Sequence, residues 1–166
     1  MLNRNMLDEK YFTKNGIEVL INDMKDGKIL YSRNYSICNA IVFTDNENAA
    51  LAHISKATSP ELLMKGYVSS ILQFTKNNLR KIKTIKEIFG DNKVIAYHIY
   101  RIGGCWSSEQ VMDSLNYDNI EKIIEIPVIY PEFRTRTVAV TINTKEIYIF
   151  PKSYSEKKMD PIIIKI

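Results

Sequence analysis

The stretch SICNAIVFTDNENAALAHI, residues 36–54, decides the fold of this chain of 166 residues. Ile41–Phe43 is an apolar run rich in β-branched residues, and Leu51–Ile54 is a second apolar run around one histidine. Asp45–Asn48 separates the two runs with residues that are typical of turns. We therefore predict a β-hairpin that folds about residues 45–48.

The open end of this hairpin carries the two most informative side chains, Cys38 and His53. Cross-strand neighbours lie about 4.5 to 5.5 Å apart between Cβ atoms, so we expect the ring of His53 to reach the sulfur of Cys38. A neighbouring imidazolium lowers the pKa of a cysteine and favours its nucleophilic thiolate form. The alternative interpretation is structural, because a free cysteine in a strand commonly acts as a small buried apolar residue.

Local patterns predict the elements on both sides of this hairpin. Glu18–Ile21 and Lys28–Tyr31 flank a turn at residues 25–27, which predicts a first hairpin. Ser59, Pro60 and Glu61 form a typical helix start, with a hydroxyl N-cap and a proline at the first helical position. The apolar residues that follow at helical spacing predict one long helix that packs on a sheet: Leu63, Met64, Tyr67, Val68, Ile71, Leu72 and Phe74.

A narrower apolar stripe predicts a shorter second helix, which ends at a stop signal in residues 90–92; its members are Leu79, Ile82, Ile85 and Phe89. Further strands are predicted at residues 93–100, 137–142 and 146–150, and a helical stretch after residues 107–109. The expected fold class is α/β or α+β, with a mixed, largely antiparallel sheet packed against one long and one shorter helix. We expect a polar lead-in at residues 1–15, a single domain at 16–152, and a charged link with a possible last strand at 153–166.

The order of these segments resembles the CheD family of chemoreceptor glutamine deamidases over roughly residues 28–150. The Gly-Ser-Cys strand start of the family is similar to residues 36–38, and its Gly-Gly-Met-Ala-His strand is similar to residues 49–53. Its Phe-Gly-Gly-Ala turn is similar to residues 102–105, and its final hairpin is similar to residues 136–150. Bacterial deamidating toxins of the cytotoxic necrotizing factor type are also similar, because they keep a Cys and a His on such strands.

The resemblance implies a bacterial protein-glutamine glutaminase, which acts in the cytoplasm or as a toxin or effector in a host cell. It implies that Cys38 is the nucleophile and His53 the proton carrier, with Ser32 in the place of a family threonine that orients the imidazole. No cofactor is implied, and the partner is a protein that carries a reactive glutamine. Three alternatives remain open: a transglutaminase, a cysteine protease with the same Cys-His pair, and an inactive binding module.

Cys105 and His98 form the competing pair for nucleophile and base. Cys105 follows the turn at Gly103 and Gly104, and a helix that starts after it would lower its pKa. Cys38 and Cys105 are the chain's two cysteines, so a disulfide framework is not predicted, although a bridge between them stays possible. No metal site is predicted, because no two of the four Cys and His side chains have the short spacing of structural zinc ligands.

The net charge of +4 includes a basic cluster that could meet an acidic partner; the cluster consists of Lys76, Arg80, Lys81, Lys83 and Lys86. We favour a solvated face over nucleic-acid binding, because no aromatic residues alternate with these charges. No apolar run approaches the ~18 residues of a membrane span, and the first ten residues lack the apolar core of a signal peptide. We therefore expect a soluble protein, made in the cytoplasm or secreted by a route without a signal peptide.

Overall fold

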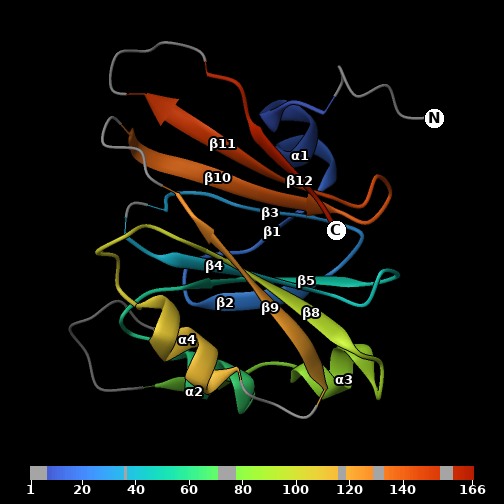
Figure 1. Cartoon of the computed structure of the whole chain (residues 1–166), viewed down its shortest axis with the longest axis vertical. Coiled ribbons are helices and arrows are strands. Elements are labelled where there is room, and N and C mark those ends of the chain that lie inside the picture. The colour runs from blue at the N-terminus through green and yellow to red at the C-terminus, as the bar shows by residue number, and fades with distance from the viewer. Residues whose placement is uncertain (1–6, 36, 71–77, 116–118, 129–132, 154–158) are drawn as a thin grey trace.

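The computed structural model describes all residues except 1–6, 36, 71–77, 116–118, 129–132 and 154–158. Its fold is α+β, and the described residues form two five-stranded sheets that lie face to face, with helices on both outer sides (Figure 1). The fold class is therefore as predicted from the sequence, but the strands form two sheets where one was expected.

The first sheet contains the predicted C-terminal hairpin, formed by β10 (Phe133–Thr141) and β11 (Glu146–Ser153). The predicted last strand, β12 (Ile162–Lys165), pairs with β11 at one edge. At the other side β10 pairs with β3 (Ile29–Ser32), and β3 pairs in parallel with the short edge strand β1 (Ile17–Glu18).

The second sheet contains the predicted hairpin, formed by β4 (Asn39–Thr44) and β5 (Ala49–Ile54). Edge strand β2 (Asp23–Asp26) pairs antiparallel with β5, and the predicted strand β8 (Val94–Tyr100) pairs antiparallel with β4. Strand β9 (Ile120–Pro127) completes the sheet in parallel with β8. Each sheet is thus mixed but largely antiparallel.

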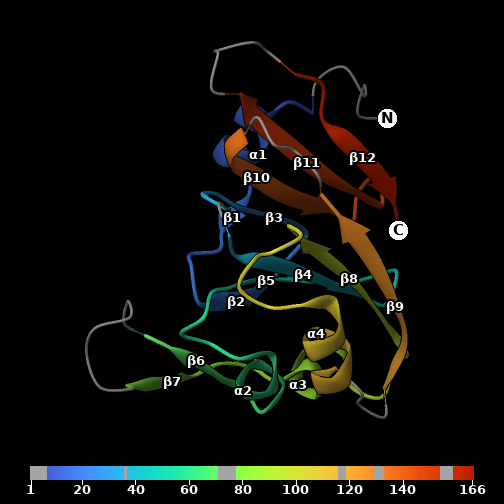
Figure 2. The ribbon, with the colours of Figure 1, turned by 60° about the vertical axis from the view of Figure 1, so that its left-hand side comes forward.

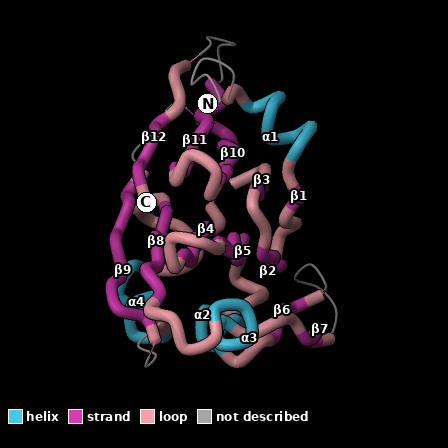
Figure 3. Tube along the Cα trace, turned by 90° about the vertical axis from the view of Figure 1, so that its right-hand side faces the viewer, coloured by secondary structure: helices cyan, strands magenta, loops and turns pink. Residues whose placement is uncertain are grey.

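The first hairpin predicted from the sequence is wrong. Of the run Glu18–Ile21 only Glu18 lies in a strand, β1, which pairs in parallel with β3 in the first sheet; the segment between the two runs becomes β2 of the second sheet. Residues 19–22 and 33–38 therefore both carry the chain from one sheet to the other, as Figure 3 shows at the side where β1, β2 and β3 lie. These two crossovers define one end of the sandwich.

An apolar core fills the space between the two sheets, and it joins them because alternate residues of each inner strand point into it. Its fully buried members include Leu30, Val138, Val140, Ile147 and Ile149 from the first sheet and Ala40, Val42 and Leu51 from the second. Each buried Val, Leu or Ile among them contributes about 1.5 to 3 kcal/mol on burial. The two sheets therefore stabilise each other.

Helices cover the outer faces of both sheets. Helix α1 (Glu9–Asn15) places Phe12 against Tyr148 and Phe150 on the first sheet, so the expected polar lead-in at residues 1–15 is wrong for its second half. On the second sheet, a separate core lies under three helices: α2 (Pro60–Met64), α3 (Ile85–Phe89) and α4 (Ser108–Ser114).

The prediction of one long and one shorter helix is also wrong. Ser59 caps α2 as expected, but the helix ends at Met64, and Gly66 then adopts a φ of +80°. Strand β6 (Tyr67–Ser69) follows and pairs with β7 (Leu79–Lys81) in a small sheet beside α2 (Figure 2). Ile71, Leu72 and Phe74 of the predicted stripe lie outside the described residues.

Candidate functional site

Ser32 and His53 meet at the end of the sandwich that the two crossovers close. Ser32 is the last residue of β3 in the first sheet, and His53 lies in β5 of the second. The Oγ atom of Ser32 lies 2.8 Å from Nδ1 of His53, and both residues are buried. The predicted contact between a hydroxyl and the imidazole is therefore present across the two sheets.

The hydrogen bonds of Ser32 fix the tautomer of His53. The hydroxyl of Ser32 donates its single proton to the backbone carbonyl of Val19, which can only accept. Ser32 Oγ must then accept from Nδ1–H of His53, so the ring proton lies on Nδ1. The Nε2 atom of His53 is consequently the position that can take up a proton.

Tyr35 orients the same imidazole through its ring. Its ring stacks on the His53 ring with centroids 3.8 Å apart and an interplanar angle of 22°. Tyr35 is fully buried and comes from the 33–38 crossover. Sequence analysis missed this residue, because nothing in a loop tyrosine indicates which distant strand it will cover.

Cys38 lies on the same face of the second sheet as His53, but it is not directly opposite. The strand partner of His53 is Ala40, and Cys38 precedes Ala40 by two residues. Cys38 and Ala40 both belong to the core between the sheets, so Cys38 is a diagonal neighbour of His53, with Cβ atoms about 7 to 8 Å apart or somewhat less. The register set by the Asp45–Asn48 turn thus makes the spacing wider than the hairpin pattern suggested.

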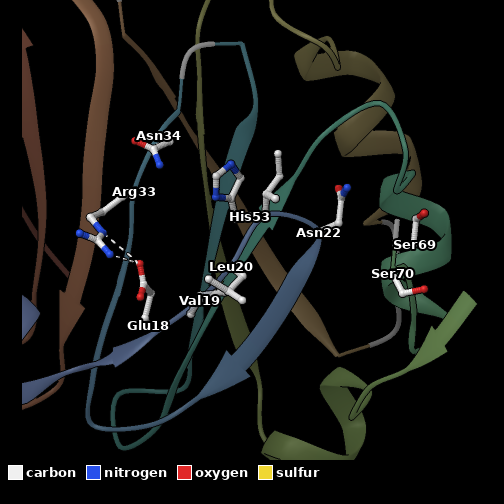
Figure 4. Close-up of a pocket in the computed structure, with 10 residues that line it drawn as sticks. Glu18, Val19, Leu20, Asn22, Arg33, Asn34, His53, Ser69 and Ser70 are labelled. Carbon is white, nitrogen blue, oxygen red and sulfur yellow. Dashed lines mark hydrogen bonds and ion pairs between the residues drawn. The ribbon is translucent and has the colours of Figure 1, made fainter. Parts of the chain in front are cut away.

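The thiol of Cys38 is well covered, since the residue is only 4% exposed and His53 only 1%. A pocket of about 590 Å³ lies beside them, and of the three predicted site residues His53 alone lines it. Figure 4 shows His53 at its centre, between side chains of the two crossovers. The pocket therefore reaches His53, while Cys38 is not among the residues that line it.

The lining of this pocket is nearly neutral. Its charged members, Glu18 and Arg33, form an ion pair of 2.6 Å, drawn with dashed lines in Figure 4. The hydrogen bond and charge of Glu18 raise the pKa of Arg33, which keeps the guanidinium charged. The other lining residues besides His53 are apolar or carry amide and hydroxyl groups: Val19, Leu20, Ile21, Asn22, Asn34, Ser69 and Ser70.

Of the competing pair, His98 lies on the opposite face of the second sheet from Cys38, and Cys105 lies in the turn that follows β8. His98 is paired with Ile41, which points toward the helices, so its ring cannot serve Cys38. Asn39 lies between the two: its Oδ1 accepts from Cys105 Sγ at 3.0 Å, and its Nδ2 lies 2.6 Å from Nε2 of His98. Nδ2 also donates to the carbonyl of Trp106 at 3.0 Å.

This second cluster is not an activated pair. Burial raises the pKa of Cys105 to about 11, with a smaller rise from Cys38, so Cys105 is a protonated thiol at neutral pH. Burial likewise lowers the pKa of His98 to about 4, so its imidazole is neutral. Because Asn39 separates the sulfur from the ring, no direct proton transfer links them. The suggestion that a helix start would activate Cys105 is therefore wrong.

The basic cluster is partly neutralised by neighbouring carboxylates. Arg80 pairs with Asp23 at 2.6 Å, Lys83 with Asp26 at 3.2 Å and Lys86 with Asp91 at 3.6 Å. Lys76 lies outside the described residues. The first two ion pairs connect β7 and the residues after it to β2, so Arg80 and Lys83 have a structural role.

Within the described part of the chain, no three His, Cys, Asp or Glu side chains converge as metal ligands. No described helix has the length and apolar character that a membrane crossing requires. Comparison of the whole sequence with protein-family models finds no match, and comparison with curated proteins finds no significant match either.

Proposed function

We propose that this protein is a cysteine-dependent amide hydrolase that deamidates a glutamine side chain of another protein. The observation that carries the proposal is the contact of Ser32 with Nδ1 of His53, because it leaves Nε2 as the basic atom of a ring on the face that holds Cys38. In this arrangement the hydroxyl of Ser32 orients the imidazole of His53, the imidazole activates the thiol of Cys38, and the thiol attacks the amide.

The reaction would proceed in two halves. His53 Nε2 takes the proton of Cys38, and the thiolate attacks the carboxamide carbon, with its oxyanion held by backbone N–H groups that include that of Cys38. The tetrahedral intermediate collapses as His53 returns the proton to the leaving ammonia, which leaves a thioester on Cys38. Water, deprotonated by His53, then hydrolyses the thioester to glutamate and restores the thiol.

The pocket beside His53 supports an amide as the substrate group. Its two charged side chains neutralise each other, and its remaining polar groups are amides and hydroxyls, which suit a neutral carboxamide better than a carboxylate. The target protein would lie in the cytoplasm of the producing bacterium or of a host cell.

Ammonia release tests the proposal directly. The probe is carbobenzoxy-glutaminyl-glycine, incubated with the reduced full-length protein in a coupled assay for ammonia. We expect release by the wild-type protein and none by Cys38→Ala, while the matched variant Cys105→Ala stays active because the Cys105 thiol is protonated and hydrogen-bonds to Asn39. If the Cys38→Ala protein, shown to be folded by circular dichroism, releases ammonia at the wild-type rate, Cys38 is not the nucleophile.

Two neighbouring enzyme activities share the first half-reaction. A transglutaminase would let an amine attack the thioester, and a protease would attack a backbone amide. Adding dansylcadaverine and a glutamine-rich acceptor such as casein separates them: a labelled protein indicates transfer, shortened chains indicate proteolysis, and ammonia alone indicates deamidation.

The burial of Cys38 favours a second candidate, an inactive binding module on the same fold. Such a module has no need of a reactive thiol. Iodoacetamide labelling at neutral pH distinguishes the two, because alkylation rate follows thiolate fraction and access. An active site requires Cys38 to react faster than Cys105, whereas equally slow labelling of both cysteines supports the module.

A further inference from the structure

The turn that contains Cys105 packs directly on the backbone that precedes Cys38. The amide N–H of Cys105 donates to the carbonyl oxygen of Ile37 at 2.9 Å. A Cβ atom added to Gly104 would lie 2.9 Å from the same oxygen, closer than side-chain carbons approach a backbone oxygen. The two segments are therefore in contact at the backbone, and a glycine is what allows it.

This contact fixes how far apart the two cysteines can lie. The Ile37 carbonyl oxygen is bonded through its peptide group to the Cα of Cys38, and the Cys105 nitrogen is bonded to its own Cα. Adding these bonded distances to the hydrogen bond puts the two Cα atoms no more than about 7 Å apart. Disulfides require a Cα separation of about 4.4 to 6.8 Å, so this upper limit lies close to the range that a bridge needs.

The two sulfur atoms are also close enough to interact electrostatically, because a charge on Cys38 raises the pKa of Cys105. Cys105 Sγ is held by bonds from its thiol to Asn39 Oδ1 at 3.0 Å and to the Ile54 carbonyl at 3.6 Å. Sulfur hydrogen bonds are weak, so rotation of the Cys105 side chain away from Asn39 costs little. Cys105 lies in an irregular segment that follows β8, outside any helix or strand.

We propose that Cys38 and Cys105 are a modification site, a pair that forms a reversible intramolecular disulfide when the protein meets a peroxide. The formation of the bridge stands on the backbone contact alone. Its consequence rests on the proposed function, because a bridged Cys38 has no thiolate and cannot attack an amide.

The oxidation balances with hydrogen peroxide as the oxidant. The thiolate of Cys38 attacks one peroxide oxygen, the O–O bond breaks, and Cys38 becomes a sulfenic acid while hydroxide leaves and takes up the thiol proton as water. Cys105 then attacks the sulfenic sulfur, the S–O bond breaks, and a second water leaves with the proton of Cys105. Two thiols are oxidised to one disulfide, and one peroxide is reduced to two waters.

The experiment treats the full-length reduced protein with hydrogen peroxide and measures its intact mass, followed by a peptide map without reductant. We expect the mass to fall by that of two hydrogens, one linked peptide pair containing residues 38 and 105, a monomer on a non-reducing gel, and full reversal by dithiothreitol. The matched variant Cys105→Ser should lose no hydrogen mass and should instead yield a Cys38 sulfenic acid that dimedone traps. A wild-type protein that gains oxygen at Cys38 with Cys105 still free, or that forms linked dimers only, would overturn the proposal.

The mass readout keeps this proposal separate from the proposed function. A protein that forms the linked peptide but never releases ammonia in its reduced form has the disulfide without the hydrolase activity. A reduced protein that releases ammonia, yet forms no linked peptide under peroxide, has the activity without the switch. Where both hold, peroxide should abolish ammonia release by the wild-type protein, and dithiothreitol should restore it.

Discussion

At the scale of single residues, the proposed mechanism depends on the position of one proton on His53. Ser32 is the acceptor that keeps this proton on Nδ1, and its own proton is committed to Val19. Replacing Ser32 by alanine removes this acceptor and permits the other tautomer. We expect Ser32→Ala to slow both iodoacetamide labelling of Cys38 and ammonia release by roughly tenfold to a hundredfold.

The control for this variant is Thr44→Val, which removes a buried hydroxyl from the hairpin that carries His53 without touching His53. Ser32→Ala removes two hydrogen bonds and Thr44→Val removes one, each worth about 1 kcal/mol, and urea unfolding measures both losses of stability. Equal labelling rates in Ser32→Ala and Thr44→Val would mean that Ser32 has only a structural role.

A second residue, His98, makes the stability of the fold depend on pH. Burial lowers its pKa in the folded protein to about 4, whereas the ordinary value is 6.5. Between these two values the unfolded chain binds a proton that the folded protein does not, so acidification favours unfolding. The stability that comes from keeping His98 neutral is fully present above about pH 6.5. It is lost as the pH falls toward 4, and the free energy of unfolding decreases by on the order of 3 kcal/mol in total.

Urea unfolding of the wild-type protein and of His98→Gln, measured at intervals from neutral pH down to the acid limit of folding, isolates this effect. The variant cannot titrate at this position, so its stability should fall less steeply with acid, whatever its stability at neutral pH. Parallel curves for the two proteins would show that His98 does not take up the proton on unfolding.

At the scale of elements, the turn of residues 101–105 holds the backbone in front of Cys38. An added Cβ at Gly104 would lie 2.8 Å from the Arg101 carbonyl and 2.9 Å from the Ile37 carbonyl, and neither backbone oxygen can move freely. We expect Gly104→Ala to lower the free energy of unfolding by about 2 to 3 kcal/mol and to change the labelling rate of Cys38.

Gly103→Ala is the matched control, since its Cβ would meet nothing within 4 Å. Its φ of +77° still disfavours alanine, at a cost of about 1 kcal/mol, but the turn keeps its place. Urea unfolding and Cys38 labelling are measured on both variants. A larger loss in Gly103→Ala, or unchanged labelling in Gly104→Ala, would argue against tight packing of this turn on Ile37.

The elements that could be predicted from the sequence are those whose signal is local. The β4–β5 hairpin carries both of its apolar runs and its turn within residues 39–54, and Ser59 caps α2 through its own neighbours. The prediction of one long helix was wrong because the apolar stripe continues past Gly66 although the helix does not. Gly66 adopts a φ of +80°, and the chain continues as β6. Val68 still reaches the core under the helices, but from a strand.

The residues of the candidate site also separate into those with a local sequence signal and those without one. Cys38 and His53 could be named because they share one hairpin, and Ser32 because of the family resemblance. Tyr35 and the role of Asn39 could not be predicted, because each depends on a segment that is distant in the chain, β5 for Tyr35 and the Cys105 turn for Asn39. Hydropathy also gave no sign that β1 and β2 belong to different sheets.

At the scale of the whole molecule, the site exists only where the two sheets are held together. Ser32 comes from one sheet and His53 from the other, so their contact depends on the core between the sheets. Because both inner faces share that core, the two sheets should unfold in one cooperative transition. A destabilising substitution in the first sheet, which lacks His53, should then lower the stability of the second sheet by the same amount.

The chain's single tryptophan makes this prediction measurable. Trp106 packs against the core under the helices of the second sheet and donates to the Ser55 carbonyl at 3.0 Å. Ile147 is fully buried in the first sheet and faces the core between the sheets. We expect Ile147→Ala to lower the free energy of unfolding by about 3 kcal/mol, and tryptophan fluorescence and circular dichroism to report the same shifted urea midpoint.

Ile163→Ala is the control, because Ile163 also lies in the first sheet but is 46% exposed. Its effect should stay within about 0.5 kcal/mol on both probes, since little apolar area leaves the core. A fluorescence midpoint that stays at the wild-type value in Ile147→Ala, while the circular dichroism midpoint falls, would mean that the sheets unfold separately. The contact between Ser32 and His53 would then open before the second sheet unfolds, and ammonia release would disappear at a lower urea concentration than the fluorescence change.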